Sequence, residues 1–185
     1  MNPYHQGSLD SLCGVYAIVN ATKRINRLND KQSQRLFNDI IRYLDKEGWL
    51  AEIILEGSLC NLIQDIIDNS TGRKICNFRV LYEGVLTPNL DEYWNYLVDL
   101  QKKYCDEKAG KNGAIIIELG GIHDHWSVID KITPRQIKLY DSESIKTINR
   151  NKCTTSKKRK RYDMNILYPA QTIFLVNSSV DFQKG

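Results

Sequence analysis

The chain has 185 residues, 42% of them apolar and 26% charged, with a formal net charge of +4. This length and composition suit one globular domain with a core of useful size. No apolar run approaches the roughly 20 residues needed to cross a bilayer, and the first residues lack the basic and apolar regions of a signal peptide. We therefore expect a single domain in the cytoplasm with no membrane contact.

Helical spacing of apolar residues predicts four helices in the first 110 residues. They are expected over residues 13–25 (capped by Asp10 or Ser11), over 31–46, from 58 to about 67, and from 89 to about 103. A short strand is expected over 78–82, after a break at 69–72.

Strands follow the helices. β-branched or alternating sequences predict strands over 114–119, 125–130, 136–140 and 171–176. A turn over 132–135 joins the second strand to the third, and residues 146–163 are expected to form a polar loop. Helices before an antiparallel sheet predict an α+β fold, with a helical part over about 1–110 and a sheet part over about 111–185.

The cysteines suggest reduced thiols. Cys13, Cys60, Cys76, Cys105 and Cys153 are odd in number, and no two have C-x-x-C spacing. A disulfide framework or zinc site is therefore not expected, and neither is a cofactor. Free cysteines are usually small buried apolar residues, which is the interpretation for Cys60, Cys76 and Cys105.

Basic charge is concentrated late in the chain. Eight basic residues and no acidic one lie between Lys146 and Arg161, and without them the formal net charge would be −4. The protein as a whole is therefore not expected to bind polyanions generally. The run over 157–161 suggests a solvated loop, a weak contact with phosphate or nucleic acid, or an import-type signal.

Cys13 is the candidate nucleophile. It begins a predicted helix, where the macrodipole favours the anionic thiolate over the thiol. Gly14 places no side chain beside the sulfur, which leaves room for a substrate backbone. A cysteine of this kind still needs a base to react well at neutral pH.

The base must come from His5, His123 or His125. His125 has the best context, because it opens a predicted strand and the next strand ends at Asp141. In an antiparallel hairpin that turns at 133–134, the start of the first strand lies beside the end of the second. His125 and Asp141 are then neighbours, and the carboxylate orients the imidazole.

These motifs resemble those of papain-like cysteine peptidases. The resemblance is carried by Gln6-Gly-Ser-Leu-Asp-Ser-Leu-Cys13-Gly14, His125-Trp-Ser-Val and Tyr140-Asp141-Ser142, and it is strongest to bacteriocin-leader-processing (double-glycine) peptidase domains. It implies a papain-like fold, in which the helix of Cys13 packs on an antiparallel sheet. It also implies that Cys13 is the nucleophile, His125 the general base and acid, Asp141 the orienting residue and Gln6 an oxyanion-hole donor.

The expected activity is that of a cysteine peptidase or isopeptidase acting on an amide bond of a peptide or protein. Gly14, His123 and Trp126 are expected to line the substrate site, although Trp126 also suits the core. One alternative is a transglutaminase-like acyltransferase or deamidase, in which the histidine follows the cysteine more closely than the 112 residues here. Another is a non-catalytic interaction module on the same fold.

Overall fold

The structure, a computed structural model, describes most of the chain. The described residues are 2–5, 11–57, 60–71, 78–80, 89–105, 113–143, 145–156 and 163–177. Gln6, Asp10, Cys76 and the basic run 157–161 lie outside them, so the predictions that concern these residues are not addressed. Within these ranges, no helix combines the length and the apolar character needed to span a membrane.

Helix α1 (Cys13–Asn26) is the central helix, and most of its side chains are buried between the sheet and the other helices. It begins at the predicted residue. Ser11, one of the two predicted caps, is not at the N-cap position. Leu12 is the N-cap residue, and its side chain makes no capping hydrogen bond. The helix ends at Arg27, whose φ of 53° gives the left-handed C-cap common at helix ends.

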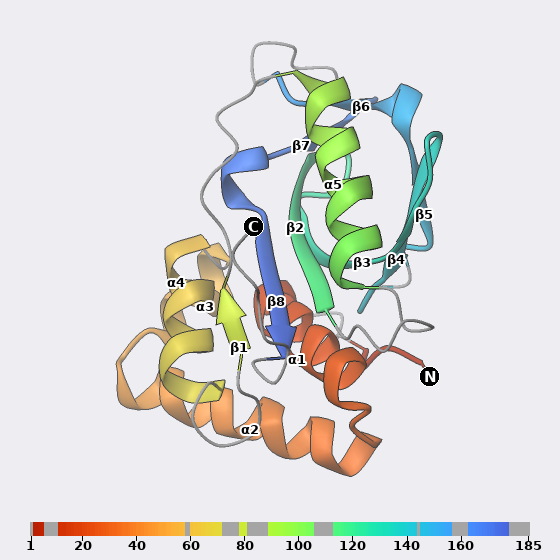
Figure 1. The fold of residues 1–185 in the computed structure, drawn as a ribbon. Helices are drawn as coiled ribbons and strands as arrows, with labels where there is room; N and C mark the ends of the chain where they lie inside the picture. The colour runs from red at the N-terminus through yellow and green to blue at the C-terminus, as the bar shows by residue number, and fades with distance from the viewer. Residues whose placement is uncertain are drawn as a thin grey trace.

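Helix α2 (Asp30–Lys46) covers the side of α1 that faces away from the sheet (Figure 1). A capping box between Asn29 and Gln32 fixes its start. Its buried residues are Ser33, Leu36, Ile40 and Leu44. Their three- and four-residue spacing is the amphipathic pattern that predicted this helix.

Two short helices complete this layer. Helix α4 (Cys60–Ile66) continues into a π-helical turn (Ile67–Thr71), and it corresponds to the helix predicted from residue 58. Helix α3 (Leu50–Glu56) was not predicted. Its seven residues make about two turns, which is too short for an apolar period to distinguish a helix from other structure.

The described strands form an eight-stranded sheet in the order β1-β8-β2-β3-β4-β5, with β7 beside the end of β2 and β6 beside β7 (Figure 1). The strands are β1 (Phe78–Val80), β2 (Gly113–Gly121), β3 (His125–Ile132), β4 (Gln136–Tyr140), β5 (Thr147–Asn149), β6 (Cys153–Thr154), β7 (Asn165–Leu167) and β8 (Ile173–Asn177). All described pairings are antiparallel except that of β6 with β7. The α+β prediction is confirmed.

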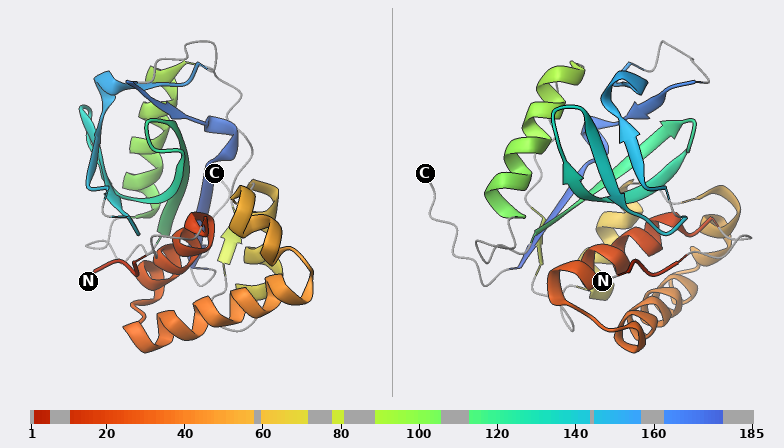
Figure 2. Two further views of the ribbon diagram at one scale, coloured as in Figure 1. Left: turned by 180° about the vertical axis from the view of Figure 1, so that it is seen from behind. Right: turned by 90° about the vertical axis from the view of Figure 1, so that its right-hand side faces the viewer.

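Helices lie on both faces of the sheet. On one face, Trp126 and Val128 of β3 pack in a core cluster with α1. On the other face, Ile129 belongs to a second cluster with helix α5 (Leu90–Tyr104), which starts close to the predicted residue and is capped by Asn89. Figure 2 shows α5 across the sheet from α1 and α2. The prediction that all helices form a separate part before the sheet is therefore too simple.

The predicted loop over residues 146–163 is wrong in its first half. Strand β5 extends the sheet beyond β4, and β6 pairs with β7. These strands have two or three residues, too few to show a two-residue period. Tertiary pairing and the burial of Ile148 and Cys153 hold them in place instead.

Candidate active site

Cys13 is the first residue of α1 and is partly exposed. Its helix has no acidic residue in the first turn, and no side chain of the N-cap residue occupies the first amides. Negative charge on the sulfur is therefore favoured by the helix terminus and opposed by no carboxylate of that turn.

A bulge sets the register of the hairpin that carries His125 and Asp141. The pairs are Ile132 with Ile137, Lys131 with Lys138, Ile129 with Leu139 and Val128 with Tyr140. Asp130 is thus an extra residue in β3. Continuing this register places Asp141 opposite Ser127, on the same face of the hairpin as His125. Without the bulge, Asp141 would face Val128 and point to the other side.

Side chains from both helical layers hold this bulge. Arg24 of α1 forms an ion pair with the Asp130 carboxylate and donates to its carbonyl oxygen at 3.0 Å. Gln101 of α5 donates to the same carbonyl at 3.3 Å and accepts a hydrogen bond from the amide of Ile132 at 2.8 Å. The geometry of the site therefore depends on contacts from both faces of the sheet.

Replacing Gln101 with leucine should destabilise this hairpin. The amide of Ile132 would lose its partner, and an unsatisfied buried polar group costs about 1–3 kcal/mol. We expect the free energy of unfolding, measured by urea denaturation, to fall by about that amount. Lys102→Leu, at the exposed neighbouring position, is the matched control. Equal losses in both variants would show that Gln101 does not support the bulge.

His125 and Asp141 form the predicted contact. His125 Nε2 lies 2.8 Å from Asp141 Oδ2, and both side chains are almost fully buried. The other oxygen, Oδ1, accepts hydrogen bonds from the amides of Glu143 at 2.8 Å and Ile145 at 3.2 Å. Asp141 therefore makes an ordinary Asx turn with one oxygen and orients the imidazole with the other.

The Cys13 side chain lies near enough to the imidazole for its hydrogen bonding and its charge to act on the pKa of His125, so His125 lies between a carboxylate and a thiol. Since Nε2 faces Asp141, Nδ1 is the ring nitrogen left for Cys13. Burial lowers the pKa of His125, but the hydrogen bonds and charges of Asp141 and Cys13 outweigh it and raise the pKa to about 10. Burial likewise raises the pKa of Asp141, but polar contacts with His125, Ser127 and the Glu143 amide, together with the charge of His125, outweigh it and lower the pKa.

This pair should make the stability of the protein depend on pH. A folded-state pKa of about 10 against the ordinary 6.5 gives His125 a contribution that is fully present below pH 6.5 and lost as the pH rises toward 10. We expect the free energy of unfolding to fall between pH 6.5 and 9, and Asp141→Asn to flatten this slope. The buried thiols of Cys105 and Cys153, whose pKa values are also raised, change the free energy of unfolding only above their ordinary pKa of 9. If the wild type and Asp141→Asn lose stability equally over this pH range, the His125–Asp141 pair does not raise the pKa of His125.

Two further side chains near His125 were not predicted. Glu143 Oε1 lies 3.5 Å from His125 Nδ1, on a side chain that is 48% exposed. His5 reaches the residue after Asp141, with Nδ1 3.2 Å from the carbonyl oxygen of Ser142. Glu143 follows the end of β4 in the Asx turn of Asp141, where no strand period predicts the direction of its side chain. Nothing in the sequence indicates the approach of His5, which joins segments 137 residues apart.

The other predicted site residues differ in placement. His123 is partly buried just before β3, and the following Asp124 has a φ of 45°. Gly14 is buried. Trp126 is 3% exposed in the core cluster with α1, because it points to the face of β3 opposite His125. Its burial supports the alternative interpretation, a core residue beneath the site.

The remaining described cysteines are also free thiols. Burial raises the pKa of Cys105 and of Cys153 to about 12. Burial and the nearby charge of Glu118 raise that of Cys60. These thiols keep their protons at neutral pH, so Cys13 is distinguished from them by its histidine. In the described ranges, no three histidine, cysteine or carboxylate side chains gather in a way that could hold a metal ion.

Comparisons of the chain with protein-family models, curated proteins and solved structures found no match. The function is therefore inferred from the chemistry of the site.

Proposed function

We propose that the protein is a cysteine peptidase or isopeptidase of the papain-like kind. The observation that supports this most is the buried imidazole of His125 between the carboxylate of Asp141 and the thiol of Cys13. A nucleophile, a base and a group that orients the base are the parts that covalent catalysis on an amide requires.

In the proposed reaction, the thiol proton of Cys13 already lies on His125 when the sulfur attacks the amide carbonyl carbon. The tetrahedral intermediate collapses to a thioester as His125 protonates the departing amine. Water then attacks the thioester, His125 accepts its proton, and the acid product leaves with the thiol restored. Asp141 keeps the ring oriented and stabilises its charged form throughout.

The start of α1 suits the developing oxyanion. Backbone amides in the first turn of a helix point outward along the axis, and the amide of Cys13 is the natural donor there. The proposed second donor is the side chain of Gln6, a role that rests on the resemblance of the N-terminal motif. The free thiols of the described cysteines fit a reducing compartment such as the cytoplasm.

The test is cleavage of a peptide library by the wild-type protein and by Cys13→Ala, with products identified by mass spectrometry. We expect two shorter peptides per substrate with the wild type and none with Cys13→Ala. Cys60→Ala, which removes a thiol outside the triad, should keep the activity. An added primary amine separates hydrolysis from acyl transfer, because transfer gives an amide that is heavier than the acid product by the mass of the amine less one water. Cleavage by Cys13→Ala would overturn the proposal.

A further inference from the structure

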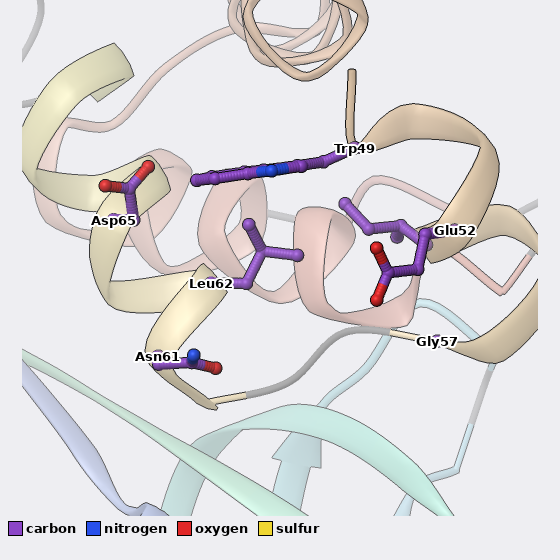
Figure 3. Close-up of a pocket in the computed structure, with 7 residues that line it drawn as sticks. Trp49, Glu52, Gly57, Asn61, Leu62 and Asp65 are labelled. Atoms are coloured by element: carbon purple, nitrogen blue, oxygen red, sulfur yellow. The ribbon is translucent and has the colours of Figure 1, made fainter. Parts of the chain in front are cut away.

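A pocket of about 400 Å³ lies between α3 and α4, and no triad residue lines it. Figure 3 shows the indole ring of Trp49 above Leu62, with the carboxylates of Asp65 and Glu52 on either side of Leu62. The pocket thus combines an aromatic face, an aliphatic floor and two acidic groups. Its volume is within the range of small-ligand sites.

Asp65 is held in a fixed orientation. Its Oδ2 accepts a hydrogen bond from the Tyr43 hydroxyl, and its Oδ1 accepts one from Asn69 Nδ2 at 2.8 Å. Burial and the bond to Asp65 raise the pKa of Tyr43 to about 12, so this hydroxyl remains a donor. Each carboxylate oxygen has a second lone pair for a further donor. No ion pair within the described ranges uses Asp65 or Glu52.

The chain around the pocket is acidic. Residues 47–72 include five acidic residues and no lysine or arginine, although the protein as a whole is basic. The local field therefore attracts cations. Beside the pocket, the outer side of α3 exposes Ile54 and Leu55, the latter 80% exposed. Leu55 lies three residues after Glu52, on a neighbouring part of the helix surface.

A basic side chain matches each of these features. A guanidinium or ammonium group binds over the face of a tryptophan and pairs with carboxylates, and its aliphatic stem packs on leucine. A planar guanidinium suits this pocket better than a lysine ammonium. It stacks on the face of an indole ring and binds a carboxylate through two donors. The exposed apolar residues of α3 favour a polypeptide over a free small cation, since they can contact the residues beside the basic one.

We propose that this pocket binds an arginine side chain of a polypeptide, and a lysine side chain more weakly. The site is separate from the triad and does not depend on the chemistry at Cys13. A polypeptide bound there would be held on the surface of the helical layer by its charge.

The test uses Cys13→Ala, so that bound peptide is not cleaved, and follows tryptophan fluorescence. Trp49 is partly exposed, whereas Trp94 and Trp126 are 0% and 3% exposed, so a bound peptide changes mainly the signal of Trp49. The probe is acetyl-Leu-Arg-Leu-amide, and the control peptide has neutral citrulline in place of arginine. We expect saturable binding of the arginine peptide at physiological salt and at least tenfold weaker binding of the citrulline peptide.

Matched variants locate the site. Glu52→Gln and Asp65→Asn should each weaken binding fivefold or more, whereas Glu56→Gln and Asp68→Asn, exposed positions outside the pocket, should change it less than twofold. Circular dichroism tests whether Asp65→Asn still folds, because this variant also loses the charge beside Tyr43. If Asp65→Asn unfolds, Glu52→Gln still tests the proposal, because Glu52 is exposed and its replacement should not affect folding.

Two results would overturn the proposal. One is that the citrulline peptide binds as well as the arginine peptide. The other is that the pocket variants and their controls lose affinity equally.

Discussion

Replacing Cys13 with alanine is expected to abolish peptide cleavage and to leave the fold intact. The sulfur is the attacking atom in the proposed reaction, and loss of a nucleophile of this kind costs about a million-fold in kcat. Alanine is tolerated at the first position of α1, because Cys13 is partly exposed and alanine has the highest helix propensity. The measurements are kcat on one peptide and thermal unfolding by circular dichroism, with Cys60→Ala as the matched control.

A different result would change the role of this residue. If Cys13→Ala unfolds the protein, Cys13 is structural. If the variant folds and still cleaves the peptide, another group is the nucleophile.

Replacing His125 with alanine is expected to cost nearly as much. Without the imidazole, no group of the triad takes the thiol proton or protonates the departing amine. Asp141→Asn should be milder, with a loss of about a hundredfold, because the imidazole itself remains. Asparagine keeps the Oδ1 acceptor for the turn, but it puts the donor Nδ2 in place of the charged acceptor Oδ2 beside His125. The measurements are kcat and KM on the same peptide.

The other two histidines are the controls for this series. His5→Ala and His123→Ala should keep activity within about tenfold, since neither contacts Asp141 in the structure. If His123→Ala abolishes cleavage and His125→Ala does not, the base is His123 and the role of Asp141 changes with it.

The sequence predicted the parts of the site that depend on regular periodicity. The starts of α1 and β3, the turn after Ile132 and the end of β4 follow from apolar spacing and turn residues, and together they bring Asp141 to the end of the hairpin where His125 lies. The turn and strands alone predict the wrong face for Asp141, since the bulge at Asp130 shifts the register by one residue. This bulge depends on Arg24 and Gln101, which approach from distant helices and leave no local pattern.

Segments held by tertiary contacts were missed for the same reason. Helix α3 and strands β5 and β6 are too short for a period to be visible. The role of Gln6 stays a prediction from the N-terminal motif. The pocket beside Trp49 was not predicted either. Its walls come from α4 and from α3, a helix that apolar spacing did not predict.

The most direct test of the central claim is the rate at which iodoacetamide alkylates Cys13 at pH 6, in the wild type and in His125→Ala, followed by mass spectrometry. In the proposed triad the imidazole holds the proton of the Cys13 thiol and makes the sulfur nucleophilic, whereas an ordinary thiol is less than about 1% ionised at this pH. We predict that wild-type Cys13 reacts much faster than Cys60, Cys105 and Cys153, whose pKa values are raised. We also predict that His125→Ala slows Cys13 by at least about tenfold. Equal rates at Cys13 in the two proteins would contradict a Cys13–His125–Asp141 triad.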